Sequence, residues 1–430
     1  MKKILSLTLI LVIALSGLTL VACSGDLEAG TGFNVNSLST RNLMRGEYMS
    51  IELYNDFFVP EYEYAHRNIP QLEGESDWSD CWRFTGLVSM MLRLNELTDN
   101  KYQDEMKSIF SAFDYYRGVR DDNTVGPNGT GREFTVFAVN RATRGKFKAN
   151  ALGTLSVFDD QIWIAREYYN AYKLYGDKVY LDTAIELAEY VYLVGFMPNV
   201  GGITWGQDYT SRHSCSNAPF IKVLVDLYKE TKRDDFLTWA TNVYEFMYNT
   251  LRDPSDNLYY DLVGTIFNED GVPVSNDSFD KTKYTYNSGA MISAGVAMYN
   301  VTGNETYLDH ARATAEGCRA YFGYHDFKEG YVMYPTATTT WFNLVMYIGY
   351  YDLFLADPTQ TVYLDDVQKT IDYAYDNYGR DGYIPVSWLA GWEEGWAKSD
   401  CKNLLDHTSH AETYLLLSQY QQAKEELQEK

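Results

Sequence analysis

Cysteine is scarce in this chain, and its spacing does not suggest a metal centre. Five cysteines occur in 430 residues, and no two of them are separated by only two residues, as in most zinc-binding motifs. The chain also lacks the glycine-rich loop that cradles phosphate and the turn that carries the nucleophile of α/β-hydrolases. We therefore expect neither a metal nor any other cofactor.

Positive charge and flexible linkers are in short supply as well. The 36 lysines and arginines are outnumbered by 59 acidic residues, so the formal net charge is −23. A surface of this sign disfavours nucleic acids and other polyanions as partners. No proline- or serine-rich linker divides the chain, and its 46% of hydrophobic residues suffice for a substantial core. We expect one large domain, which is monomeric.

Five short polar segments, each containing an aromatic residue, recur along the chain. They are Asn100–Asp104, Lys178–Asp182, Asp234–Thr238, Asn304–Asp309 and Gln360–Asp365. An apolar segment precedes each one, and amphipathic segments such as 182–194 and 309–321 follow, with apolar residues at i, i+3 and i+4. Each polar segment is therefore predicted to be the turn of an αα-hairpin.

The number of helices predicts the fold. Five hairpins supply ten helices, segment 408–424 adds one more, and segment 41–57 pairs with it as the twelfth. The apolar members rich in small residues suit an inner layer that is covered on both sides; they include 160–175, 217–231, 287–301 and 341–355. The prediction is an all-α protein, an (α/α)6 barrel of twelve helices in two concentric layers.

Long connections separate the hairpins and are predicted to gather on one face. They are 117–158, 195–216, 251–286, 322–340 and 378–407. Every short turn lies at one end of the helices, so every long connection lies at the other end. Long loops in a compact domain are usually functional, and we expect the site on this face. One segment, Leu258–Val263, is compatible with a short hairpin strand.

The first residues resemble a bacterial lipoprotein signal. Two lysines precede an apolar run, which ends at Leu20-Val21-Ala22-Cys23. The resemblance implies a signal peptide over 1–22, lipidation of Cys23, a tether over 23–40 and a catalytic domain over 41–430. It also implies attachment to a bacterial membrane, as an outer-membrane or cell-surface protein. A plain transmembrane anchor is the alternative.

The remaining cysteines are Cys81, Cys215, Cys318 and Cys401, and the implied compartment is oxidising. Two of them, Cys215 and Cys401, lie in the long connections that are predicted to gather on one face. A disulfide between these two and buried free thiols are both compatible with the sequence.

Asp159 and Asp160 form the sharpest chemical feature, at the start of a predicted inner helix. Adjacent Cα atoms lie about 3.8 Å apart, and side chains that splay from them can hold their carboxyl groups around 5 Å apart, as in retaining glycosidases. The helix N-terminus favours an anion, and the neighbouring charge raises the pKa of the second carboxyl group. The alternative is that the pair only caps the helix.

Aromatic residues are abundant, with 38 tyrosines and 9 tryptophans. Aromatic rings in the long connections offer flat faces for the C–H surfaces of sugars. Packing between the helix layers explains many of these rings equally well.

The chain resembles glycoside hydrolase family 76, the α-1,6-mannanases. The resemblance rests on Phe158–Trp163, on Gly201–Trp205 with Asn217 soon after, and on Tyr284–Gly289. It implies an (α/α)6 barrel that cleaves α-1,6-mannan with retention, Asp159 as the nucleophile and Asp160 as the acid/base. Candidate substrate-binding residues are Trp82, Trp163, Trp205, Asn217, Tyr286 and Asn287. Departures from the family pattern are Ser288 and the segment 212–216.

The resulting hypothesis is a lipid-anchored endo-α-1,6-mannanase that acts on mannan or mannose-rich oligosaccharides outside the cytoplasm. Two alternatives remain. One is another α/α-barrel enzyme of the unsaturated uronyl hydrolase type, whose anionic substrate fits poorly with the acidic chain. The other is a surface glycan-binding lipoprotein without turnover.

Overall fold

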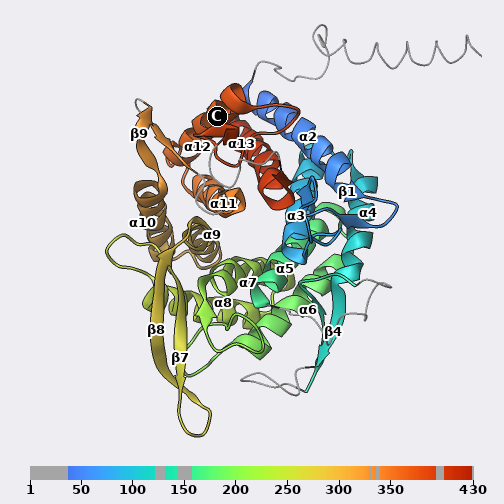
Figure 1. Ribbon diagram of the computed structural model, residues 1–430. Helices are drawn as coiled ribbons and strands as arrows, with labels where there is room; N and C mark the ends of the chain where they lie inside the picture. Colours follow the sequence, from blue (N-terminus) through green and yellow to red (C-terminus); the bar gives the residue numbers. More distant parts are fainter. Residues whose placement is uncertain are drawn as a thin grey trace, which may run out of the picture.

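Twelve α-helices in two concentric rings make up most of the described protein (Figure 1). The computed structural model describes residues 37–121, 131–142, 157–328, 331–335, 339–393 and 401–428. The predicted signal peptide and Cys23 lie outside the described residues. The first described helix begins at Leu38, capped by the side chain of Ser37, so helical structure starts within the stretch predicted as a tether.

The inner ring consists of the helices that follow the long connections. They are α3 (Cys81–Leu97), α5 (Phe158–Tyr175), α7 (Ala218–Thr231), α9 (Thr285–Thr302), α11 (Thr340–Ala356) and α13 (Leu404–Gln428). Each packs against the next in this order, and α13 packs against α3, which closes the ring. Their bounds agree with the predicted inner segments to within a few residues.

The outer ring consists of the amphipathic partners. They are α2 (Leu38–Phe57), α4 (Gln103–Phe113), α6 (Lys178–Gly195), α8 (Asp234–Phe246), α10 (Glu305–Phe322) and α12 (Val362–Tyr378). Five of them pack on the inner helix before them in the chain, and α2 packs on α13 as well as on α3. The predicted (α/α)6 barrel, including the pairing of its two terminal helices, is confirmed.

Glycines let the inner helices approach closely. Helix α9 is buried along nearly its whole length, as its apolar composition predicts. A Cβ atom on Gly289 would lie 2.3 Å from Cα of Met346 in α11, and one on Gly349 would lie 2.5 Å from the carbonyl oxygen of Gly289. The contact between α9 and α11 therefore requires glycine at both positions.

The hairpin turns are shorter than predicted. Most of the five short polar segments already form the first turn of the outer helix. Helix α6, for example, begins at Lys178. Gly176 and Gly303 end α5 and α9 in the left-handed conformation, with φ of 72° and 70°, which glycine adopts without steric cost. The acidic residues of the segments suit a helix N-terminus rather than a loop.

Short antiparallel strands occupy the long connections. They are β1 (Phe58–Val59) with β2 (Tyr64–Ala65), β3 (Asn68–Ile69) with β11 (Lys402–Asn403), β4 (Arg117–Asp121) with β5 (Glu133–Phe137), β9 (Tyr324–Lys328) with β10 (Tyr331–Met333), and a sheet of β6 (Arg212–His213), β7 (Tyr260–Phe267) and β8 (Pro273–Lys283). The β7–β8 hairpin extends away from the barrel and is longer than the strand predicted at Leu258–Val263 (Figure 1). No helix within the described ranges is long and apolar enough to cross a membrane.

Candidate active site

A cavity of about 420 Å³ opens where the inner helices begin. This volume falls within the range of sites that bind small molecules. The residues that line it come from the starts of inner helices and from the long connections; they are Asp80, Trp82, Arg83, Val139, Val157, Asp159, Asp160, Trp163, Trp205, His213, Cys215, Asp261, Tyr286, Trp341 and Phe342. The face predicted to hold the site thus contains a cavity, and both predicted carboxylates reach it.

The connection that follows α6 holds the start of α5. The backbone N–H of Phe158 donates to the carbonyl oxygen of Trp205 at 2.8 Å. Val157 is the N-cap residue and contributes no side-chain hydrogen bond. Asp159 and Asp160 lie in the first turn of the helix. Neither aspartate is the N-cap residue of α5, so helix capping, the alternative interpretation, does not explain the presence of two carboxylates at this point of the chain.

Asp159 lies among polar groups that favour its charged form, yet one of its oxygens has no partner. The side chains of Trp205 and Cys215 and the backbone N–H groups of the helix start all act to lower its pKa. Its Oδ1 atom is buried and has no hydrogen-bond partner. Burial raises the pKa of Asp159 to about 6, against the hydrogen bonds, which lower it. At neutral pH the group is mostly ionised.

Asp160 is more strongly biased towards its protonated form. Asp160 is 8% exposed, and its Oδ2 atom accepts a hydrogen bond from Sγ of Cys81 at 3.2 Å. Burial raises the pKa of Asp160 well above its usual range, and the negative charge of Asp159 raises it further. The neighbouring carboxyl groups therefore differ at neutral pH, because one is charged and the other keeps its proton.

The backbone that carries Trp205 depends on two consecutive glycines. Gly201 and Gly202 have φ of 74° and 81°, and a Cβ atom on Gly202 would lie within 2.7 Å of three ring atoms of Phe246. Arg212, which is fully buried, donates to the carbonyl oxygens of residues 200, 201 and 264 and to Oδ1 of Asn276. One arginine thereby joins this turn to the β7–β8 hairpin.

Two predicted substrate-binding residues do not line the cavity. Asn217 is fully buried, and its side chain exchanges two hydrogen bonds with the backbone of Ile203 and donates to the carbonyl oxygen of His213. Asn287 is also fully buried and donates to Oδ1 of Asp261 at 3.1 Å. These amides hold the loop and the carboxylate that form the site, and a role in substrate binding stays a prediction for both.

The other four predicted residues line the cavity, and three of them form an aromatic wall with Trp341 and Phe342, two rings that the sequence did not single out. Trp82 and Trp163 pack edge-on against Trp341, with ring centroids 5.5 and 4.9 Å from it. Tyr286 stacks on Phe342 at 4.0 Å. Trp205, the fourth predicted residue, lines the cavity and stacks on His213.

Several polar residues of the cavity were also missed from sequence. Asp80 accepts from the backbone N–H of Arg83 at the start of α3 and pairs with its guanidinium, a helix-capping pattern that the sequence does display. Asp261 belongs to β7, and burial raises its pKa. Burial lowers the pKa of His213 to about 4, so this imidazole is neutral at pH 7. No sequence pattern brings these loops together.

The described residues contain no group of three or more histidine, cysteine and acidic side chains placed to hold a metal ion. Cys81, Cys215, Cys318 and Cys401 are free thiols, and the first three are buried.

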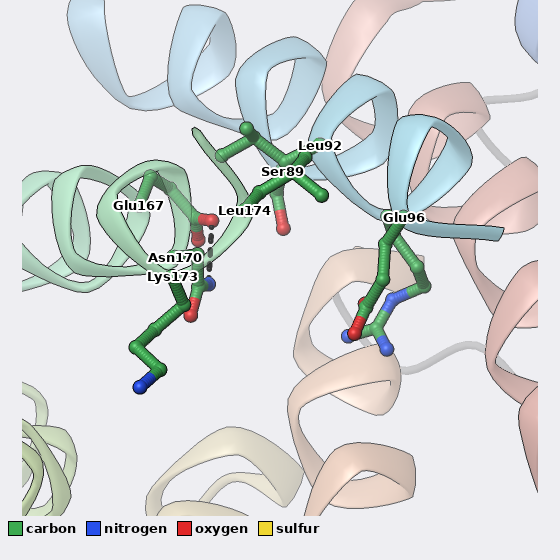
Figure 2. A pocket seen from close by; sticks show the side chains of 8 residues that line it. Ser89, Leu92, Glu96, Glu167, Asn170, Lys173 and Leu174 are labelled. Atoms are coloured by element: carbon green, nitrogen blue, oxygen red, sulfur yellow. Dashed lines mark hydrogen bonds between the residues drawn. The ribbon is translucent and has the colours of Figure 1, made fainter. Parts of the chain in front are cut away.

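A second cavity, of about 210 Å³, lies between the C-terminal halves of α3 and α5 (Figure 2). Its polar side chains pair with one another or with residues behind them: Glu167 accepts from Asn170 at 3.0 Å and from Arg166 at 2.6 Å, and Arg93 donates to Glu412 of α13 at 3.1 Å. The cavity is therefore lined by a satisfied ionic network at the opposite end of the inner helices.

Comparisons with known proteins agree with the fold. The statistical description of glycosyl hydrolase family 76 matches residues 54–380. A mannan endo-1,6-α-mannosidase of Candida albicans is 27% identical over 135 residues, which are 31% of this chain and 28% of that protein. The chain thus spans little more than a quarter of this relative's length.

Solved structures cover nearly the whole chain. The family 76 mannosidase Bt3792 from Bacteroides thetaiotaomicron has a TM-score of 0.76 and 21% identity, over 89% of this chain and 100% of that one. An inactive variant of the α-1,6-mannanase GH76A of Salegentibacter, with two consecutive aspartates replaced by asparagine and in complex with α-1,6-mannotriose, has a TM-score of 0.67 and 19% identity, over 88% and 99%. Both likenesses show a common fold.

Proposed function

The chain belongs to glycosyl hydrolase family 76, and we propose that it is an endo-acting hydrolase of α-1,6-linked mannan. The observation that carries the proposal is the pair of adjacent carboxyl groups, which line a cavity together with four tryptophans. Burial biases Asp160 more strongly than Asp159 towards its protonated form. The Candida relative is named as an endo-1,6-α-mannosidase, and the Salegentibacter enzyme was bound to α-1,6-mannotriose after exchange of two consecutive aspartates. Both names support this substrate class.

The proposed reaction is a double displacement with retention of configuration. Asp159, with Oδ1 unengaged, attacks the anomeric carbon of a mannosyl unit while Asp160 gives its proton to the departing glycosidic oxygen. A water molecule then attacks the covalent mannosyl ester as Asp160, now ionised, takes a proton from it. The sugar's hydroxyl groups find acceptors in Asp80 and Asp261, and its C–H faces pack on the tryptophans.

Product analysis of residues 24–430 with debranched α-1,6-mannan tests the proposal. Oligomannosides of several lengths early in the reaction support endo cleavage, whereas mannose alone contradicts it. Proton NMR of the first products tests retention, because a retaining enzyme releases the α-anomer first. Asp182→Asn, which alters an exposed acid in α6, serves as the matched control and is expected to behave like the parent.

Variants of the pair separate the two roles. Asp160→Asn is expected to lose about 10²–10⁴-fold in mannan cleavage. On an α-1,6-mannobioside of an acidic phenol, whose leaving group needs no proton, it should keep the first displacement, seen as a burst of released phenol, while the second step is slow. Asp159→Asn is expected to be inactive on both substrates. Mannan binding without cleavage by the parent protein would instead favour a glycan-binding protein, and cleavage of unsaturated uronides would favour the uronyl hydrolase alternative.

The proposed location is the outside of a bacterial membrane, with the lipid on Cys23. In cells, a Cys23→Ala variant is expected to leave the membrane fraction and to lose labelling by a fatty acid. Retention of both would contradict the lipid anchor.

A further inference from the structure

Each carboxyl group of the pair has a buried cysteine of its own. Cys81 is the first residue of α3 and donates from Sγ to Oδ2 of Asp160 at 3.2 Å. Cys215, in the turn that precedes α7, lines the same cavity as Asp159, and the two groups influence each other's pKa. The two thiols come from different inner-helix starts, so they flank the aspartates from two neighbouring elements.

Both thiols are fixed in place and keep their protons. Cys81 is fully buried, and its backbone N–H donates to the carbonyl oxygen of Val139 at 2.9 Å. Cys215 is 5% exposed and lines the cavity beside Tyr286. Burial and the neighbouring carboxylates raise the pKa of each thiol well above its usual range. Each therefore acts as an S–H donor rather than as a thiolate nucleophile.

We propose that Cys81 and Cys215 are positioning residues of the proposed hydrolase, and that each directs the proton state of one aspartate by donating a hydrogen bond to it. The proposal rests on the function proposed above and extends it to two residues outside the catalytic pair.

The Cys81 contact selects the oxygen that carries the acid's proton. Because Oδ2 of Asp160 accepts from the thiol, the proton to be transferred resides on Oδ1. After transfer the same thiol donates to a carboxylate anion, and hydrogen bonds to charged groups are stronger than those to neutral ones. The contact thus favours the state in which Asp160 has already released its proton.

The Cys215 contact acts on the ionised partner. Together with Trp205 it favours the charged form of Asp159, against the burial that disfavours it. This contact also orients the Asp159 carboxylate, whose Oδ1 atom has no partner.

Infrared spectroscopy tests the contacts without any need for turnover. The S–H stretch falls in a spectral window free of other protein bands, and it shifts with hydrogen bonding. We expect a red-shifted band that disappears in Cys81→Ala and moves in Asp160→Asn, and a second one that disappears in Cys215→Ala and moves in Asp159→Asn. Cys318→Ala, which removes a buried thiol from α10, should leave both bands unchanged.

The pH dependence of mannan cleavage tests the effect on the aspartates. Loss of a donor raises the pKa of its acceptor, so Cys81→Ala should move the alkaline limb of kcat/KM to higher pH. Cys215→Ala should move the acidic limb to higher pH instead. A shift of about 0.5–1 pH unit is expected for one weak hydrogen bond. Serine variants, which keep a donor, should bring each limb back to or below its position in the parent.

Three results would overturn the proposal. The first is S–H bands that do not respond to the aspartate variants. The second is that Cys81→Ala and Cys215→Ala leave both limbs of the pH profile of kcat/KM, and KM itself, unchanged. The third is that Cys318→Ala shifts these limbs by as much as the other two variants do. If the parent cleaves no mannan, the proposed function fails, but the infrared test still decides whether the thiols bond to the aspartates.

Discussion

At the scale of single residues, the structure makes two identical side chains chemically different. Trp205, Cys215 and backbone N–H groups lower the pKa of Asp159, whereas Asp160 accepts a hydrogen bond from Cys81 and faces its neighbour's charge. The difference arises from the surroundings and not from the Asp-Asp sequence. Sequence reasoning therefore found the pair and named both cysteines, but it did not place them beside the pair, because Cys81 is 79 residues from Asp160 and Cys215 precedes a different inner helix.

The first prediction concerns the indole of Trp205. Trp205→Phe keeps a ring but removes a donor that lowers the pKa of Asp159, so that pKa should rise above its value of about 6. The acidic limb of the pH–activity profile should then move to higher pH by about 0.5–1 unit. Trp239→Phe, which alters a ring stacked on Tyr192 in the outer layer, serves as the control. If the acidic limb of the profile does not move in Trp205→Phe, then Trp205 does not lower the pKa of Asp159.

The second prediction is that the site reduces the stability of the fold. Burial raises the pKa of Asp159 from its ordinary 3.8 to about 6, so its ionisation opposes folding. Stability present below pH 4 is lost as the pH rises through 6. Two pH units correspond to about 3 kcal/mol.

Asp159→Asn should therefore raise the free energy of unfolding at pH 7 by up to about 3 kcal/mol, with no gain at pH 4. Urea denaturation at the two pH values measures the effect, and Asp182→Asn is the control. A variant that is no more stable than the parent at pH 7 would refute the argument.

At the scale of elements, the connection after α6 is the part on which the site depends most. It supplies Trp205, and it is held by Asn217, by Arg212 and by a turn with two glycines. Its motif was recognised in the sequence, but the hydrogen bonds by which Asn217 holds the loop were not predictable, because a motif does not reveal which way an amide points. The helices were predictable from their periodicity; the hairpin of β7 and β8 was only partly so, since its outer strand is polar and exposed on both faces.

The third prediction compares two glycines of left-handed conformation. Gly202→Ala adds a Cβ atom that meets the Phe246 ring, whereas Gly176→Ala adds one with nothing within 4 Å. Both replacements cost about 1 kcal/mol of backbone strain, and the first adds roughly 1–3 kcal/mol from overpacking.

Only Gly202→Ala should also reduce mannan cleavage, because the displaced turn carries Trp205. Thermal unfolding and kcat/KM of both variants measure the two effects. Equal losses of activity in the two variants would show that the turn does not position the site.

At the scale of the whole molecule, one seam closes the barrel. Sequence order brings each inner helix beside the next, but α13 meets α3 only after the complete turn of the ring. The buried contacts of this seam are partly ionic: Glu412 of α13 accepts from Ser89 at 2.9 Å and from Arg93 at 3.1 Å, both in α3. The counting of helices predicted the closure, whereas the ion pair was not visible from the helical pattern.

The fourth prediction concerns this seam. Glu412 is 1% exposed, and its replacement by alanine leaves the Arg93 guanidinium without its buried carboxylate, which typically costs 3–5 kcal/mol. Glu412→Gln keeps acceptors for Ser89 and Arg93 and should lose roughly half as much.

Glu230→Ala is the matched control, because Glu230 also joins two inner helices, through Tyr172 and Lys173. It lies near the surface, where ion pairs contribute about 0–1 kcal/mol. Urea denaturation gives the three losses; a loss in Glu412→Ala no larger than in Glu230→Ala would mean that packing alone holds the ring closed.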